Sequence, residues 1–162
     1  MFADPLTSVH TLLSFAAILL GFAALPAWLG HGGRRRWTPA FLAVAILVTA
    51  TGFLFPFVGF TPAFVTGIVA SAIFVAVLVA RFGSSRHPRI EAVGLVASLY
   101  LLVFVLIAQL FAKVPALTAL APTGSEPPFA VAQVICLAAF VWLGWRAWRV
   151  HGALPPVAGA AG

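Results

Sequence analysis

The sequence predicts an all-α integral membrane protein, a bundle of five transmembrane helices with its N-terminus outside and its C-terminus in the cytoplasm. Three observations support this prediction. Of the 162 residues, 63% are hydrophobic and 7% are charged, whereas a soluble domain is about 25% charged. Apolar stretches long enough to cross a bilayer recur along the chain. The basic residues fall in short clusters between these stretches, as they do in the cytoplasmic loops of membrane proteins.

Five stretches are apolar over about the 20 residues that a helix needs to cross about 30 Å of hydrocarbon. They are predicted at about 6–29, 40–57, 62–82, 92–112 and 128–150. Pro56, Gly59 and Pro62 break the long apolar run between the second and third spans. Residues 1–150 then form one membrane-embedded bundle, and residues 151–162 form a flexible tail of small residues and prolines. A four-span arrangement, with the second or third span re-entrant, remains an alternative.

The distribution of Lys and Arg sets the predicted orientation, because cytoplasmic loops are enriched in both. With five spans, eight of the nine basic residues lie on one side and only Lys113 lies on the other. The eight are Arg34, Arg35, Arg36, Arg81, Arg86, Arg89, Arg146 and Arg149. The five tryptophans map to the same boundary, where indole rings anchor helices; they are Trp28, Trp37, Trp142, Trp145 and Trp148. We therefore expect a multi-pass protein of the bacterial inner (cytoplasmic) membrane.

The loop 113–128, on the periplasmic side between the fourth and fifth spans, concentrates polar side chains in an apolar chain. Lys113 follows the last turn of a helix, where a cation meets the negative end of the helix dipole. Glu126 precedes two prolines, a pattern typical of a helix start, and Thr123 has capping-box spacing to Glu126. These charges are either helix-end devices or a Lys113–Glu126 pair that holds the loop as a lid. Together with Ser125, they are the predicted loop or partner-docking residues.

Four polar side chains have a similar predicted depth behind this loop. His10 and Ser14 share a face near the outer end of the first span, Gln109 lies one turn before Lys113, and Gln133 lies early in the fifth span. Polar groups inside a membrane are costly without partners, so they usually face the bundle interior. They either hydrogen-bond one another and join helices, or line a small ligand pocket that faces the periplasm.

A quinone or a haem is the cofactor for which this pocket has suitable chemistry, and the four polar side chains would be its binding residues. The imidazole of His10 can hydrogen-bond a quinone carbonyl or ligate a haem iron. A bis-histidine haem within one chain is not expected, because His31, His87 and His151 lie beside arginines in cytoplasmic segments. The redox interpretation therefore centres on His10, with Gln109 and Gln133 beside it.

Several other functions are not favoured by the sequence. No catalytic residue and no metal site is predicted, because the nucleophile-elbow and zinc motifs are missing. The single cysteine, Cys136, excludes a disulfide within the chain. Nucleic-acid binding is not expected, since no soluble basic domain remains to do it. A small transporter is a further alternative, although no acidic or basic side chain is predicted in the middle of a span.

The stretch KVPALTALAPTGSEPPFAVAQ, with WTPAFLAVAILVTATGFLFPF earlier in the chain, resembles a group of short, uncharacterised bacterial inner-membrane proteins. The most distinctive part of the resemblance is the APTGSEPPF loop between the last two spans. The resemblance implies an inner-membrane protein and supplies no activity, so no catalytic residue is carried over from it.

These observations favour a non-enzymatic role. We expect an accessory or assembly subunit of a larger membrane complex, whose periplasmic loop 113–128 docks a partner or covers a small polar pocket. The expected partners are the lipid bilayer and either other membrane subunits or further copies of the chain. The alternative is a quinone- or haem-binding redox protein with its site around His10.

Overall fold

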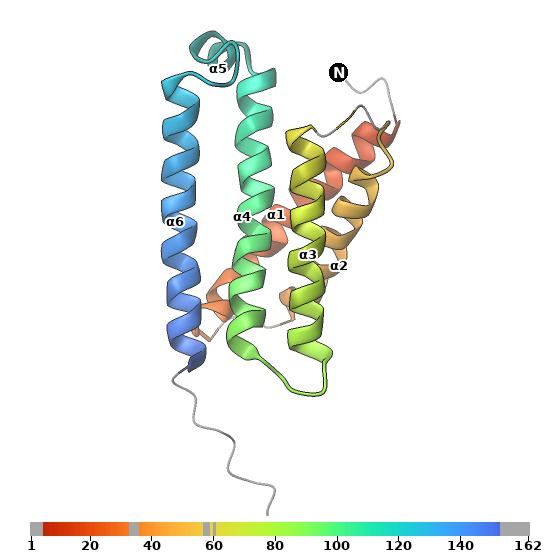
Figure 1. Cartoon of the computed structure of the whole chain (residues 1–162), viewed down its shortest axis with the longest axis vertical. Helices are drawn as coiled ribbons and strands as arrows, with labels where there is room; N and C mark the ends of the chain where they lie inside the picture. The colour runs from red at the N-terminus through yellow and green to blue at the C-terminus, as the bar shows by residue number, and fades with distance from the viewer. Residues whose placement is uncertain (1–4, 33–35, 57–58, 60, 153–162) are drawn as a thin grey trace, which may run out of the picture.

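The computed structural model of the protein is a bundle of α-helices (Figure 1). It describes residues 5–32, 36–56, 59 and 61–152. The helices are α1 (Pro5–Trp28), α2 (Trp37–Gly52), α3 (Pro62–Phe82), α4 (Pro88–Lys113), α5 (Pro115–Leu120) and α6 (Pro127–Gly152). Helix makes up 84% of the structure, and the predicted all-α class is confirmed. The predicted flexible tail lies outside the described residues from residue 153 onward.

Four helices, α1, α3, α4 and α6, are long and apolar enough to cross a membrane. The helix α2 is shorter than its predicted span 40–57, since it begins at Trp37 and ends at Gly52 after 16 residues. Its length of about 24 Å is less than the roughly 30 Å of a hydrocarbon layer. Gly52 is a weak helix former, and Pro56 disfavours helical geometry in the residue before it. The predicted break between the second and third spans is confirmed.

Proline marks the start of several helices, because the first turn of a helix has no use for the N–H that proline lacks. In α3, Pro62 follows the N-cap Thr61, whose hydroxyl accepts the N–H of Phe64 at 3.2 Å. Pro88 opens α4 and Pro127 opens α6. Both of these helices extend beyond the predicted spans 92–112 and 128–150. The first turn of α4 also contains Arg89 and Glu91, and the last turn of α6 contains Arg149 and His151.

The helices run alternately in opposite directions, so the bundle has two distinct ends. At the end that we call the basic end, α2 and α4 begin and α1, α3 and α6 finish. The opposite end, the loop end, carries α5 (Figure 1). The helix α1 crosses the bundle obliquely: at the loop end His10 contacts Thr51 of α2, and at the basic end His31, just beyond α1, lies 3.3 Å from Arg146 of α6.

Small residues let α1 approach its neighbours closely. Ala17, Gly21 and Ala24 form a buried stripe on α1, next to Phe41 of α2 and Leu99 of α4. A methyl group on Gly21 would lie 2.6 Å from Leu99 Cδ1 and 3.0 Å from Phe41 Cε2. Helices in a lipid environment associate through such close packing. The close contacts of Ala17 and Gly21 therefore lie inside the monomer.

Candidate functional site

His10 joins α1 to α2 at the loop end. Its Nδ1 lies 2.9 Å from Thr51 Oγ1, and its ring meets that of Phe55 edge-on, with 5.4 Å between centroids. The Thr51 hydroxyl also donates to the carbonyl oxygen of Leu47 at 2.8 Å. A threonine hydroxyl has one proton, so we infer that the Nδ1–H of His10 donates to Thr51. Nε2 then carries the lone pair of the imidazole.

The other predicted pocket residues lie in separate surroundings. Ser14 Oγ donates to the carbonyl oxygen of His10 at 2.8 Å. Gln133 Nε2 donates to the carbonyl oxygen of Phe104 in α4 at 3.1 Å, while Gln133 Oε1 is buried without a hydrogen-bond partner among the described residues. Gln109 is exposed. The contacts join His10 to α2 and Gln133 to α4, while Ser14 bonds within α1. Ligand binding by the set stays a prediction.

The loop 113–128 is organised around Glu126. Its Oε1 accepts the backbone N–H of Thr123 at 3.0 Å and the Thr123 hydroxyl at 2.9 Å, and its Oε2 accepts the N–H of Ser125 at 3.1 Å. The hydroxyl oxygens of Thr123 and Ser125 lie 2.6 Å apart. The Thr123–Glu126 interaction matches half of a capping box, in which the acid accepts the N–H three residues before it.

Two opposing effects act on the Glu126 carboxyl. Partial desolvation raises its pKa, but the hydrogen bonds from Thr123 and Ser125 together lower the pKa by more, so that it lies below the ordinary 4.5. In the part of the chain that the structure describes, the ion pair joins Arg81 to Glu91. Of the two interpretations of these charges, the Lys113–Glu126 pair is not formed. The carboxylate of Glu126 accepts N–H groups of its own turn, as the helix-end interpretation of Glu126 predicts.

The six-residue helix α5 fills part of the segment that was expected to be a loop. The Thr118 hydroxyl donates to the carbonyl oxygen of Phe111 at 2.7 Å, which fastens α5 to the end of α4. The side chains of Val114 and Leu120 are 37% and 57% exposed. This segment thus carries exposed apolar side chains on a backbone held by its own hydrogen bonds.

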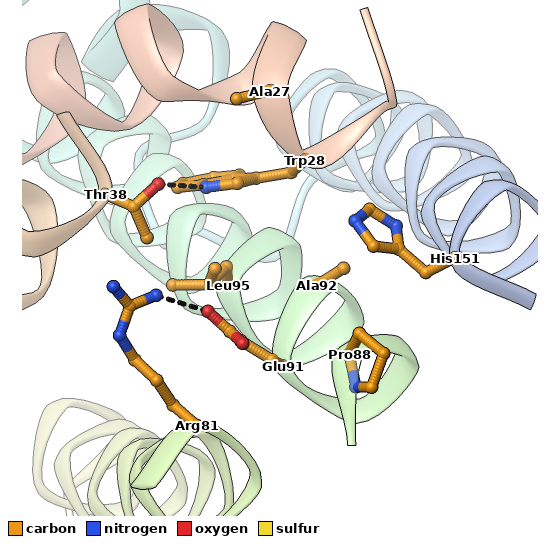
Figure 2. A pocket seen from close by; sticks show the side chains of 9 residues that line it. All are labelled: Ala27, Trp28, Thr38, Arg81, Pro88, Glu91, Ala92, Leu95 and His151. Atoms are coloured by element: carbon orange, nitrogen blue, oxygen red, sulfur yellow. Dashed lines mark hydrogen bonds and ion pairs between the residues drawn. The ribbon is translucent and has the colours of Figure 1, made fainter. Parts of the chain in front are cut away.

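A small cavity, lined by both polar and apolar side chains, lies at the basic end, opposite the predicted pocket (Figure 2). Its volume is about 90 Å³, room for about three water molecules. Helices α1, α2, α3, α4 and α6 all contribute to its lining. The residues are Ala27, Trp28, Thr38, Arg81, Pro88, Glu91, Ala92, Leu95 and His151.

Two polar interactions form between side chains that line this cavity, and each joins a pair of helices. Arg81 Nη1 of α3 donates to Glu91 Oε1 of α4 (Figure 2), in an ion pair whose side chains are 18% and 16% exposed. The indole N–H of Trp28 in α1 donates to Thr38 Oγ1 in α2 at 2.9 Å. Trp28 is 3% exposed, so this predicted boundary tryptophan lies inside the bundle and does not face lipid. The polar side chains Arg81, Glu91, Trp28 and Thr38 of the cavity lining are thus bonded in two pairs, each of which joins two helices.

Sequence reasoning missed this cluster. Its signal was Glu91, one of only three acidic residues, which follows the basic cluster Arg81, Arg86 and Arg89 within a few positions. An isolated acid among arginines at a helix start is a candidate for an ion pair with one of them. The spacing alone did not identify Arg81 as the partner, because that choice depends on how α3 and α4 pack.

Within residues 5–32, 36–56, 59 and 61–152, no three His, Cys, Asp or Glu side chains gather as a metal site would require. Comparison of the chain with protein-family models, with curated proteins and with solved structures gives no significant match. The function must therefore be argued from the chain's own geometry.

Proposed function

We propose that the chain is a five-span protein of the bacterial inner membrane, with its N-terminus outside and its C-terminus in the cytoplasm. The outward faces of its helices support membrane insertion. Leu12, Leu19, Val75 and Val141 are each more than 60% exposed, and soluble proteins rarely expose apolar surface on this scale. The basic end would face the cytoplasm, following the enrichment of Lys and Arg in cytoplasmic loops.

The contacts of α2 support five spans over four, although α2 is short. Thr38, in its first turn, bonds to Trp28 at one end of α1, and Thr51, in its last turn, bonds to His10 near the other end. A helix that reaches both ends of its spanning neighbour connects the same two sides. An odd number of spans then puts the two chain ends on opposite sides of the membrane.

We further propose a non-enzymatic role, as an accessory or assembly subunit that docks a partner through the loop 113–128. The observation that carries this proposal is the set of partners to which the polar groups of the loop end are hydrogen-bonded. Those of the loop are bonded among themselves, around Glu126, while Val114 and Leu120 are exposed. At the loop end, His10 and Gln133 are engaged with neighbouring helices. The polar groups of this loop hydrogen-bond one another, and it carries exposed apolar side chains. Such a loop is better suited to contact with another protein than to covering a pocket.

Two variants test the docking role. Leu120→Glu places a carboxylate on the loop, and Ser84→Glu places one on the exposed turn at the basic end as a matched control. A stoichiometric partner in detergent extracts should be retained by Ser84→Glu and lost with Leu120→Glu. Retention by both variants would refute docking through the loop. Reporter fusions after Gly152 and within 121–126 test the topology separately.

A second candidate, a redox protein that binds a quinone or haem, is favoured by the inferred tautomer of His10. Fixing Nδ1–H on an acceptor leaves Nε2 free to ligate iron or to accept a hydrogen bond from a quinol. The visible spectrum and the extractable quinone of the purified protein test it. A bound chromophore or quinone that His10→Ala removes and His87→Ala retains would favour this function over the first.

A further inference from the structure

An apolar groove of about 440 Å³ runs between α4 and α6. It is lined by Val93, Ala97 and Tyr100 of α4 and by Leu137, Val141 and Gly144 of α6. Leu137 and Val141 are 45% and 62% exposed, so the groove lies on the outer surface of the bundle. From Leu137 it follows α6 toward the basic end, where Trp145 and Trp148 also line it.

Two arginines stand over the tryptophans at the basic end of this groove. The guanidinium carbon of Arg89 lies 5.2 Å from the centre of the Trp148 ring, and that of Arg149 lies 5.2 Å from the centre of the Trp145 ring. These are cation–π distances. Arg89 Nη2 also donates to the carbonyl oxygen of Gly152 at 3.0 Å. Both guanidinium groups are therefore held in place at the mouth of the groove.

Neither arginine has an acidic partner among the residues that the structure describes. Within the described residues the ion pair joins Arg81 to Glu91, and Arg89 and Arg149 are exposed. Each guanidinium therefore keeps unused N–H donors, which form strong paired hydrogen bonds with phosphate oxygens. The combination is an apolar channel with fixed, uncompensated positive charge at one end.

We propose that this groove binds an anionic phospholipid, with an acyl chain along α4 and α6 and its phosphate at Arg89 and Arg149. The proposal rests on the membrane position and orientation proposed above. From Trp148 to Leu137 the groove follows α6 for about 16 Å, which takes an acyl chain from the headgroup level toward the bilayer centre. Basic pockets between helices on the cytoplasmic side are suited to anionic headgroups. The charged end and the apolar channel of the groove thus lie in the same order as the headgroup and the acyl chain of the lipid.

The role of the two arginines is tested by measuring which lipids the detergent-purified full chain retains. The method is native mass spectrometry with added phosphatidylglycerol or phosphatidylcholine. The wild type should prefer phosphatidylglycerol. Arg89→Gln and Arg149→Gln should each reduce its apparent affinity about fivefold, since a basic side chain near the surface contributes about a factor of that size. Arg86→Gln, at the same end but not stacked on a tryptophan of the groove, is the matched control and should keep the preference.

The groove itself is tested at Gly144, where an added Cβ would lie 4.0 Å from Val96 Cγ1, an ordinary contact distance. Gly144→Ala should retain phosphatidylglycerol, and Gly144→Leu should release it by filling the channel. Equal retention of the two lipids by the wild type, or an equal loss in Arg86→Gln, would overturn the proposal. So would a second copy of the chain in the groove, seen as a dimer that Gly144→Leu dissociates. Membrane fractionation and the reporter fusions report on insertion and topology independently of this result.

Discussion

Glu91 in the first turn of α4 is paired with Arg81 in the last turn of α3, across the short connection that turns the chain back at the basic end. The pair stands beside the Trp28–Thr38 hydrogen bond, which joins α1 to α2 around the same cavity. Two polar interactions of different kinds thus hold four helices together at one end of an otherwise apolar bundle.

Glu91→Gln should destabilise the bundle by about 1–3 kcal/mol, because it leaves the partly buried Arg81 without its charged partner. The measurement is the thermal unfolding midpoint in detergent. Arg86→Gln, which removes an exposed charge at the same end, is the control. In a double-mutant cycle with Arg81→Gln, the double variant should lose less stability than the sum of the two single losses. Additive losses would contradict the interaction.

Thr38→Val should cost about 1–3 kcal/mol, since the buried indole N–H of Trp28 loses its acceptor at nearly constant side-chain volume. Thr49→Val is the matched control. Thr49 Oγ1 donates at 3.2 Å to Ala45 in its own helix, so its loss breaks no contact between helices. Chemical denaturation of the two variants in mixed micelles compares them, and equal stability would contradict a special role for Thr38.

Gly21→Ala should destabilise the protein by about 1–3 kcal/mol, although alanine favours helices over glycine. The new methyl would press on Leu99 and Phe41, whose side chains are both 0% exposed and lie in the hydrophobic core. Gly144→Ala gives the opposite expectation, a neutral or slightly stabilising change, because its methyl meets only ordinary contact. Unfolding of both variants under identical detergent conditions measures the difference.

The turn at Glu126 should open in acid. Its folded-state pKa lies below the ordinary 4.5, so its contribution is fully present above pH 4.5 and is lost as the pH falls through the lowered pKa. The amide resonances of Thr123 and Ser125, followed by NMR in micelles, should titrate with a midpoint below 4.5. Glu126→Gln should remove this titration. A midpoint at or above 4.5 would show that the hydrogen bonds do not stabilise the carboxylate.

Much of the helical framework was predictable from local signals. Thr61 and Pro62 mark a helix start, and Gly52 and Pro56 mark the preceding end. What the local pattern did not predict was the exact length of α2, because apolar residues continue past Gly52 into the turn. The apolar side chains of Phe53 and Leu54 indicate an apolar environment and do not indicate helical backbone. The end of the helix is set by the backbone preferences of Gly52 and of the residue before Pro56.

The site was less predictable, for a physical reason. A polar side chain in an apolar chain needs a partner, but the sequence does not say which helix supplies it. His10 was expected to face Gln109 and Gln133, and instead it contacts Thr51, because α1 crosses the bundle obliquely. For Glu126 the sequence offered a local partner, Thr123, and a distant one, Lys113. The local contacts are the ones that form, since Thr123 and Ser125 offer N–H groups within three residues.

The short length of α2 has a consequence for the bilayer around it. In a membrane, a helix of about 24 Å creates a hydrophobic mismatch, which lipids relieve by local thinning. Because α2 begins level with Trp28 at the basic end, the missing length falls at its other end, next to His10 and Thr51. In the topology proposed above, lipid headgroups and water would dip toward this pair, which gives the His10 imidazole a route for proton exchange with the periplasm.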